Sequence, residues 1–310
     1  MSDVPTPSAH ARELVRGAYD MHVHIAPDVV ERRIDDVGLA HRCRELGLAG
    51  FQLKSHYTST AERAAVVRGV VPEVEVFGAI TLNRAVGGMN PVAVEIAARE
   101  GARTVWLPAV DSVNEMSGGH ELAPGAKPPV WMRLQQELRE QGVAIEPVPV
   151  VDADGALLPE TRAVLDAVAR HDLVLATGHL SRDEIFAVVD AATEAGIATI
   201  VVTHPEFPAQ DIAIDDQARL AAKGALLERC FTTPHTGKVT WERVFEAIRA
   251  TGPEHSVLST DLGQVFNPPV EDGLALMADR LLEAGFDEGE ITTMAVANTR
   301  RLAGAAEVRV

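Results

Sequence analysis

The feature that most constrains the fold is a regular alternation of short apolar runs with amphipathic segments, punctuated by glycine and other turn residues. Buried parallel strands appear as short, nearly continuous apolar runs, and the helices between them carry a 3.6-residue period. We predict strands over eight such runs, at 18–25, 50–56, 74–82, 103–110, 173–179, 198–204, 225–231 and 256–261. Eight strand–helix units in succession favour an α/β fold of the (β/α)8 TIM barrel type.

Helical patterns fill several of the intervals between these strands, at 35–46, 91–100, 182–195, 215–223 and 241–251, and a C-terminal helix is expected within 288–302. The interval between the fourth and fifth predicted strands departs from this alternation. It contains an apolar run at 143–151, then the turn residues Asp154-Gly155, and then a short second run at 156–158. This pattern predicts a small β-hairpin insertion. If 143–151 were instead a barrel strand, every later strand would shift by one. We expect a single domain over residues 1–310.

The charge balance limits the classes of partner. The 310-residue chain has 28 Lys and Arg against 45 Asp and Glu, and this formal net charge of −17 argues against nucleic acid or an anionic membrane. A small-molecule substrate is expected, and a homo-oligomer is compatible with the sequence. Cys43 and Cys230 lie far apart and form no disulfide framework, which suits a reducing compartment. Because no apolar run reaches membrane-spanning length, the sequence predicts a cytoplasmic protein.

Two histidines one residue apart, His22 and His24, stand near the end of the first predicted strand. Successive side chains of a strand point to opposite faces, so an H-x-H pair places both imidazoles on the same side. Two imidazoles in that position can hold one divalent metal ion. A purely structural pair is the weaker interpretation, because buried histidines without a ligand need hydrogen-bond partners.

Further polar side chains stand at or near the ends of other predicted strands: Lys54, His56, His179, His204 and Asp261. In a barrel, the C-terminal ends of the strands form the face that carries the active site. Alternation places Lys54 and His56 opposite the apolar Phe51 and Leu53, so both are expected to face inward. Taken alone, each histidine could be a hydrogen-bonded core residue and Asp261 a helix N-cap. The joint pattern favours a metal site.

At these positions the chain resembles the amidohydrolase superfamily of metal-dependent (β/α)8 enzymes, and the resemblance covers most of the chain. In that superfamily, one or two metals are held by an H-x-H on the first strand, histidines on the fifth and sixth, and an aspartate on the eighth. The matching residues here are His22, His24, His179, His204 and Asp261. Three phrases look more closely like an uncharacterised amidohydrolase-related branch: 82–88 (LNRAVGG), 177–181 (TGHLS) and 202–205 (VTHP).

The resemblance has one departure, at the lysine. Binuclear members commonly bridge their metals with a carboxylated lysine from the fourth strand, whereas the fourth predicted strand here contains none. Lys54 lies on the second strand. It could carry the bridging carbamate from a different direction, or it could be a free ammonium that binds a substrate carboxylate or phosphate.

Four residues are candidates for substrate binding. His56 lies on the inward side of the second strand, and Asn83 follows the third, where it could also cap a turn. His120 lies in the glycine-rich loop 117–125, which could close over the site or be a plain surface loop. His235 follows the seventh strand, and it too could belong to the site or to a plain surface loop.

The expected cofactor is one or two divalent metal ions per chain, with Zn²⁺ the best match to imidazole and carboxylate ligands, and Mn²⁺, Fe²⁺ or Ni²⁺ the alternatives. We expect His22, His24 and Asp261 to bind the first metal, and His179 and His204 the second, with Lys54 bridging if carboxylated. The resemblance implies that Asp261 also transfers protons, and His204 is the second catalytic candidate.

The expected activity is metal-dependent hydrolysis of a small-molecule amide, lactam, lactone or ester by activated water. The alternatives are a mononuclear metal-dependent decarboxylase, a phosphoesterase, and a non-catalytic barrel that binds a metal or ligand.

Overall fold

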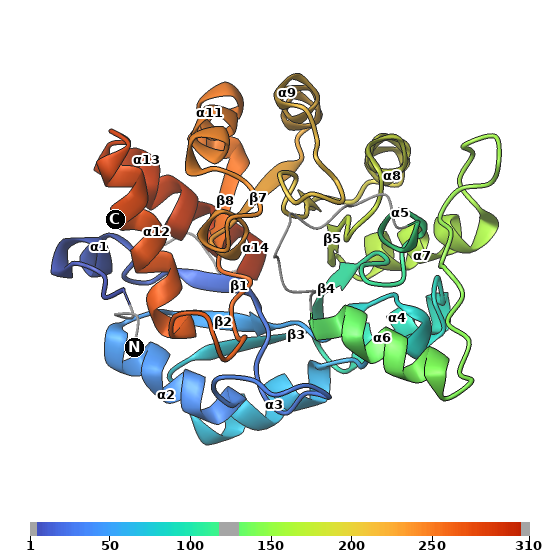
Figure 1. Ribbon diagram of the computed structural model, residues 1–310, viewed down its shortest axis with the longest axis horizontal. Helices are drawn as coiled ribbons and strands as arrows, with labels where there is room; N and C mark the ends of the chain where they lie inside the picture. The colour runs from blue at the N-terminus through green and yellow to red at the C-terminus, as the bar shows by residue number, and fades with distance from the viewer. Residues whose placement is uncertain (1–4, 118–129, 305–310) are drawn as a thin grey trace.

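Eight parallel strands form one sheet in the sequential order β1-β2-β3-β4-β5-β6-β7-β8, in a computed structural model that describes residues 5–117 and 130–304 (Figure 1). The strands are β1 (Tyr19–Val23), β2 (Gly50–Leu53), β3 (Glu75–Thr81), β4 (Ala102–Trp106), β5 (Val174–Ala176), β6 (Ile200–Val202), β7 (Leu226–Cys230) and β8 (Ser256–Ser259). All eight fall within or overlap the predicted segments, so the predicted (β/α)8 barrel is confirmed.

The barrel closes between its first and last strands. The N–H of His24 donates to the carbonyl of Leu262 at 2.8 Å, and the N–H of Asp261 donates to the carbonyl of His22 at 2.9 Å. The side chain of Asp20 adds to this seam, because it accepts hydrogen bonds from the N–H of Thr260 at 3.0 Å and from its hydroxyl at 2.5 Å. Closure therefore brings the H-x-H segment beside Asp261.

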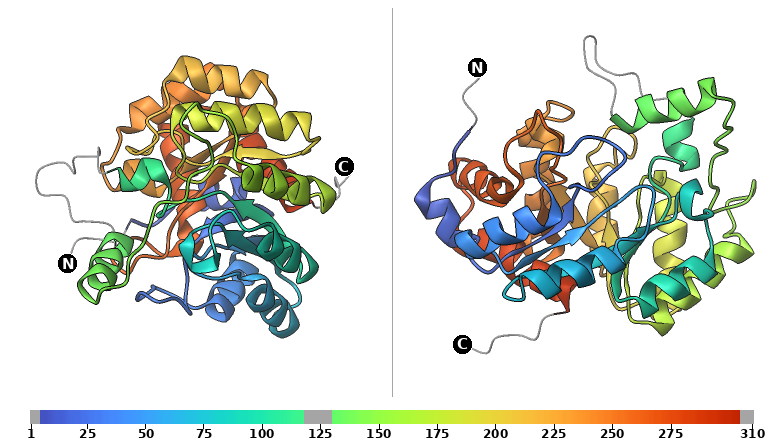
Figure 2. Two further views of the ribbon diagram at one scale, coloured as in Figure 1. Left: turned by 90° about the vertical axis from the view of Figure 1, so that its right-hand side faces the viewer. Right: turned by 90° about the horizontal axis from the view of Figure 1, so that it is seen from below.

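Most of the helices lie around the outside of the strands in all three ribbon views (Figures 1 and 2). They are α1 (Ala9–Leu14), α2 (Asp36–Leu46), α3 (Ala61–Val70), α4 (Pro91–Arg99), α5 (Val113–Met116), α6 (Val130–Glu140), α7 (Pro159–Arg170), α8 (Arg182–Glu194), α9 (Ile214–Ala222), α10 (Thr232–His235), α11 (Trp241–Thr251), α12 (Gly273–Glu283), α13 (Glu288–Thr292) and α14 (Asn298–Ala303). Short 3-10 turns occupy Arg84–Val86, Pro253–His255 and Val270–Asp272, and a π-helical turn, Thr293–Ala297, joins α13 to α14.

Hydrophobic side chains separate into an inner and an outer core. One cluster of buried residues includes Tyr19, Met21, Trp106, Val201 and Val257, which come from strands around the barrel. Two larger clusters contain the strand residues that alternate with these and the facing sides of the helices. The alternation predicted from the apolar runs thus packs the inside of the barrel with one set of side chains and the helix layer with the other.

The predicted hairpin is much smaller than expected. Only one antiparallel bridge, Val151↔Leu157, joins its two arms, and Val148 instead bridges to Ser112 in a parallel sense. The turn is closed by Asp152, whose carboxylate accepts from the backbone N–H of Asp154 and of Ala156 at 2.9 Å. Since β4 pairs directly with β5, the 143–151 run is not a barrel strand and the strand count holds.

Other boundaries differ modestly from the prediction. The fourth strand ends at Trp106 rather than at 110, and the predicted C-terminal helix is divided by the π-helical turn. The predictions did not include α3, α6, α7 or α12. Within the described parts of the chain, no helix combines the length and apolar character needed to cross a membrane.

Candidate metal centre

The H-x-H histidines and Asp261 converge on one point. The Oδ1 atom of Asp261 lies 3.1 Å from Nε2 of His24 and 3.3 Å from Nε2 of His22. One ligand atom from each of the three residues lies within 4.8 Å of the other two. His22 is on β1, His24 directly follows it, and Asp261 follows β8, so the closing seam of the barrel creates this group.

His22 is held in position through its other ring nitrogen. Its Nδ1 lies 3.1 Å from Oε1 of Glu228, and the same oxygen accepts a 2.8 Å hydrogen bond from the hydroxyl of Ser259. His22 and Glu228 are buried. A carboxylate in this place fixes the tautomer that carries the proton on Nδ1 and leaves Nε2 free to bind a metal.

Lys54 reaches the same point from β2. Its Nζ lies 3.0 Å from Nε2 of His22 and 4.9 Å from the ring centre of Trp106 on β4. Burial lowers the pKa of the Lys54 ammonium, and the nearby Asp261 and Glu228 only partly oppose that effect. The side chain therefore faces inward, as predicted.

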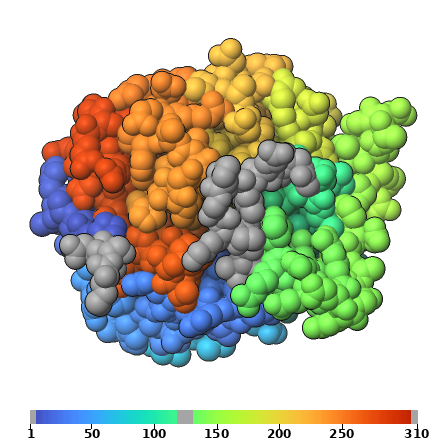
Figure 3. Space-filling view, in the orientation of Figure 1, coloured from blue at the N-terminus to red at the C-terminus, as the bar shows by residue number. Residues whose placement is uncertain are grey.

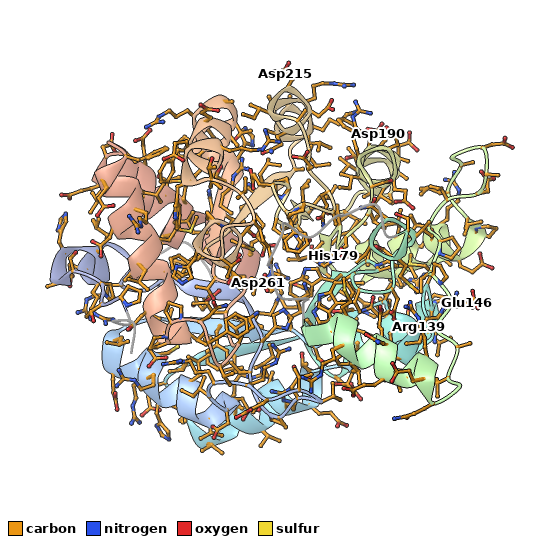
Figure 4. All side chains as sticks on the ribbon, in the orientation of Figure 1. Arg139, Glu146, His179, Asp190, Asp215 and Asp261 are labelled. Atoms are coloured by element: carbon orange, nitrogen blue, oxygen red, sulfur yellow. The ribbon has the colours of Figure 1, made fainter. Side chains whose placement is uncertain are left out.

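The remaining predicted histidines extend the group along the mouth of the barrel. The ring of His56 stacks on His24 at a centroid distance of 4.8 Å, and His179 meets His204 edge-on at 4.9 Å. The ring centres of His204 and His22 lie 6.0 Å apart, so His22 connects the two pairs. Figure 4 shows His179 and Asp261 near the middle of the ring of strands. The candidate centre thus consists of His22, His24, Lys54, His56, His179, His204 and Asp261.

His179 has a carboxylate partner of its own. Its Nδ1 lies 2.8 Å from Oε2 of Glu115, a buried residue on the short helix α5. The helix is fixed by its N-cap Ser112, whose side chain accepts from the N–H of Glu115 at 3.0 Å and donates to the carbonyl of His179 at 2.9 Å. This arrangement leaves Nε2 of His179 available, as Glu228 does for His22.

Two members of the candidate centre have strained backbones. His204 has φ of 24° and Asp261 has φ of 53°, values that residues with a Cβ rarely adopt. Such conformations cost of order 1–3 kcal/mol each and are concentrated at functional sites. Here both residues stand where a strand turns into its loop, so the strain aims their side chains into the mouth.

The charge states suit metal binding. Burial lowers the pKa of His24 to about 3, against the opposing hydrogen bond of Asp261, and burial also lowers the pKa values of His56 and His204 well below the usual range. For Asp261, burial alone raises the pKa, but His22 and His24 lower it more, so that the carboxylate stays ionised. Neutral imidazoles and an ionised carboxylate are the forms that ligate divalent cations.

The residues therefore fit a metal ion. Buried ring nitrogens without a hydrogen-bond partner among the described residues include Nδ1 of His24, His56 and His204. Unpaired polar atoms in a buried site are costly unless a ligand or water satisfies them. Three nitrogen and oxygen donors that converge on one point, with a carboxylate behind one imidazole, match the ligand set of Zn²⁺ and similar ions.

The remaining predicted site residues have other surroundings. The amide of Asn83 is buried; Nδ2 donates to the carbonyl of His56 at 3.0 Å, and Oδ1 accepts from the N–H of Ala109 at 2.9 Å. Asn83 thus positions His56, while its contact with a substrate stays a prediction. His235 is exposed, and its ring stacks on Phe231 at 4.7 Å. His120 lies outside the described residues.

Three polar residues contact histidines of the centre although the sequence did not indicate them as site residues: Glu115, Glu228 and Cys230. Glu228 and Arg229 did give a signal, because two adjacent charged residues interrupt the apolar run 225–231. Buried charged residues are rare without partners. Glu115 gave none, since its role depends on where α5 lies in space.

A cavity of ≈ 370 Å³ lies between the loop that follows β1, the loop that follows β8, and α6. Its lining residues include Val29, Arg32, Leu134, Gln264 and Phe266. Gln264 donates to the carbonyl of Asp261 at 3.1 Å, which joins the cavity wall to the centre. The volume is in the range of small-molecule sites. Figure 3 shows this face of the molecule, with α6 in green and the C-terminal helices in orange and red.

The fold is shared with solved structures of enzymes at low sequence identity. An amidohydrolase from Pseudomonas aeruginosa is 12% identical, with a TM-score of 0.58, over 95% of this chain and 99% of that one. A metallo peptidase from Rhodobacter sphaeroides, solved with a phosphinate mimic of the dipeptide L-Ala-D-Ala, is 15% identical, with a TM-score of 0.56, over 94% and 99%. A 2,6-dihydroxybenzoate decarboxylase in complex with 2,6-dihydroxybenzoate is 12% identical, with a TM-score of 0.51, over 93% and 99%.

These structures confirm the fold that the resemblance to amidohydrolases implied. No curated protein matches the chain in sequence. A family model does match, over residues 17–228, and this span contains strands β1 to β6, the beginning of β7, and every member of the candidate centre except Asp261. Because the match covers more than half of the chain, the protein belongs to that family, which is described as a family of unknown function (DUF6282).

Proposed function

We propose that this protein is a metal-dependent hydrolase that acts on an amide, lactam, lactone or ester bond of a small molecule. The observation that carries the proposal is the convergence of His22, His24 and Asp261, whose ligand atoms lie within 4.8 Å of one another at the mouth of the barrel. Support comes from solved structures with the same fold, among which are an amidohydrolase and a metallo peptidase.

In this proposal His22, His24 and Asp261 bind the first divalent ion, and His179 and His204 bind a second. Zn²⁺ is the best match to these donors, with Mn²⁺, Fe²⁺ and Ni²⁺ as alternatives. Lys54 is the proposed bridge between the two ions if its amine is carboxylated. Support for that role comes from its Nζ, which lies 3.0 Å from Nε2 of His22.

When bound, the ion supplies hydroxide at neutral pH and polarises an oxygen of the substrate. The protein side chains then have separate tasks. Asp261 accepts the proton of the attacking water at the point where the two Nε2 atoms converge, and it returns that proton to the leaving group. Glu228 and Glu115 hold the imidazoles of His22 and His179 in one orientation. His204 is proposed to contact the reacting group, and His56, Asn83, His120 and His235 are proposed to bind the substrate.

A mononuclear decarboxylase is the second candidate. The amine of Lys54 contacts His22 directly, and an amine in this place, if not carboxylated, cannot bridge two ions. Lys54 would then be free to pair with a substrate carboxylate. A decarboxylase is among the enzymes that share the fold.

The test is elemental analysis of protein purified without added metal or chelator. About two equivalents of metal per chain would favour the binuclear hydrolase, and about one would favour a mononuclear hydrolase or the decarboxylase. His22→Ala and Asp261→Asn should each lose the first metal and hydrolytic turnover, whereas His10→Ala, which removes an exposed histidine on α1, should keep both. A protein that holds no metal even after Zn²⁺ or Mn²⁺ is supplied would refute the proposal.

Lys54→Ala separates the two roles of the lysine. If the carbamate bridge exists, the variant loses the second metal, and short carboxylic acids that take the place of the carbamate restore metal content or activity. Unchanged binuclear loading in Lys54→Ala would instead assign Lys54 to the substrate.

A further inference from the structure

One cation near the candidate centre has no role in the function proposed above. Lys238 follows β7 and α10, in a loop that is attached to the end of β8. The hydroxyl of Thr232 donates to the carbonyls of Thr260 at 2.7 Å and Asp261 at 3.0 Å, and the N–H of Lys238 donates to the carbonyl of Thr233 at 3.1 Å. The position of Lys238 is therefore tied to the strand end that carries Asp261.

The ammonium of Lys238 lies close to the histidines. Its Nζ is 4.7 Å from the centre of the Phe207 ring. That ring in turn packs against His204 at 4.9 Å and His179 at 5.6 Å. Although Lys238 as a residue is exposed, the pKa of its ammonium is lowered by partial loss of hydration, against the opposing charges of Asp261 and Glu115. Both of those carboxylates belong to the centre or hold one of its histidines.

The ammonium has no acidic partner among the residues that the structure describes. Two arginines, by contrast, are paired with carboxylates: Arg32 pairs with Asp28 at 2.7 Å, and Arg229 pairs with Glu206. A cation without an acidic partner is free to attract an anion. The neighbouring hydroxyl of Thr233 is buried and also lacks a hydrogen-bond partner within the described chain.

We propose that Lys238 binds an anionic group of the substrate, so that the substrates of this protein are small molecules that carry a carboxylate or a phosphate apart from the bond to be cleaved. The inference rests on the proposed function and narrows its substrate class. A lysine is a compact point charge with rotatable donors, which suits either anion. The cation–π contact with Phe207 positions the ammonium beside His204 and His179, where a bound anion would replace the water that still hydrates it.

The test is calorimetric titration of the protein as purified, with three probes: glutarate, its neutral diamide, and inorganic phosphate. Lys238→Gln should bind the matching anion about tenfold more weakly than the wild-type protein, and Lys238→Arg should keep most of the affinity. The affinity for the diamide should not change in either variant. Lys223→Gln is the matched control, because it removes an equal charge from the C-cap of α9, where Lys223 pairs with Asp190 on the outer helix α8 (Figure 4).

Each arm of the titration has a defined meaning. A Lys238-dependent affinity for glutarate identifies a carboxylate, and one for phosphate alone identifies a phosphate. Equal affinities of the wild type and Lys238→Gln for both anions, including no binding by either protein, would overturn the inference. An equal loss of affinity for the diamide in Lys238→Gln would also overturn the inference, because a packing role of the lysine would then explain the effect. An equal loss of anion affinity in Lys223→Gln would overturn it as well, because general electrostatics would then be the cause.

Metal content measured on the same samples keeps the two proposals apart. A wild-type protein without metal but with Lys238-dependent anion affinity would contradict the proposed function alone. A metal-loaded protein without that dependence would contradict the inference about Lys238 alone.

Discussion

At the scale of single residues, the candidate centre depends on side chains that stand behind the proposed ligands. His22 contributes Nε2 to the mouth because Nδ1 is occupied by Glu228, which is itself held by Ser259. The second oxygen of Glu228 is buried and has no hydrogen-bond partner among the described residues. The carboxylate is therefore committed to the imidazole, and its cost of burial is offset chiefly through that contact.

Glu228→Gln tests this dependence. An amide retains the shape of the carboxylate but loses its charge, so the tautomer and basicity of His22 are less well controlled. We expect the affinity for Zn²⁺ to fall by about 10–100-fold, the range typical of partners that orient metal ligands. Competition with a chromophoric chelator measures the affinity.

Glu62→Gln is the matched control, because Glu62 is an exposed acid on α3. It should leave the Zn²⁺ affinity within about twofold of the wild type. An unchanged affinity in Glu228→Gln would show that His22 does not bind the metal through Nε2, or that the ring is fixed by other contacts.

The predicted ligands were accessible from the sequence because each stands at or just after the end of an apolar run, where barrel geometry alone brings it to the mouth. Glu115 and Glu228 were not, for two different reasons. Glu115 lies on a four-residue helix whose position depends on the cap at Ser112. Glu228 lies inside a strand, and only the closed barrel shows that its side chain meets His22.

At the scale of elements, the loop after β6 is held by a buried arginine. Arg229 on β7 is fully buried, and it pairs with Glu206, two residues after His204. The same guanidinium donates to Oε1 of Gln217 on α9 at 2.6 Å and to the hydroxyl of Thr251 on α11 at 2.9 Å. One side chain thus joins the His204 loop to two helices of the outer layer.

Arg229→Met removes the cation and leaves the Glu206 carboxylate buried without its partner. Breaking a buried pair in this way typically costs about 3–5 kcal/mol, so urea denaturation should show a loss of unfolding free energy of that order. Adding Glu206→Gln to Arg229→Met should restore part of the loss, because the stranded charge disappears. A double variant no more stable than Arg229→Met would show that the pair does not account for the effect.

Elements were predicted best where one physical signal dominated. All eight strands were found because strands buried on both faces are apolar throughout. The helices α3, α6, α7 and α12 were not predicted. Yet α7 and α12 contribute buried residues to the outer core, as α11 does, and α11 was predicted. The hairpin was predicted too long because the apolar run at 143–151 packs Val148 and Val150 into the outer core instead of pairing with a second strand.

At the scale of the whole molecule, the barrel closes where the centre is built. The carbonyl of Leu262 accepts the N–H of His24, and the residue that follows, Gly263, packs directly against the backbone of His24, just after β1. Gly263 has φ of 136°, and a Cβ atom placed on it would lie 1.5 Å from the carbonyl oxygen of His24. Closure thus needs a residue without a side chain at this position.

Gly263→Ala should therefore damage both stability and metal binding. The comparison with Gly285→Ala separates two causes, because Gly285 also has a positive φ, of 84°, but a Cβ there would meet nothing within 4 Å. Backbone strain alone should cost Gly285→Ala about 1 kcal/mol, whereas the collision at the seam should cost Gly263→Ala at least about 3 kcal/mol.

The contact at the seam also links barrel closure to metal binding. Relief of the collision moves the carbonyl of His24 away from β8, and the imidazole of His24 must move with it, away from Oδ1 of Asp261 at 3.1 Å. Gly263→Ala that still folds should therefore bind Zn²⁺ more weakly than Gly285→Ala, by chelator competition at a temperature where both are folded. Equal stability and equal metal affinity in the two variants would mean that the two ends of the sheet do not meet as tightly as this, and that the geometry of the His22–His24–Asp261 group does not depend on closure.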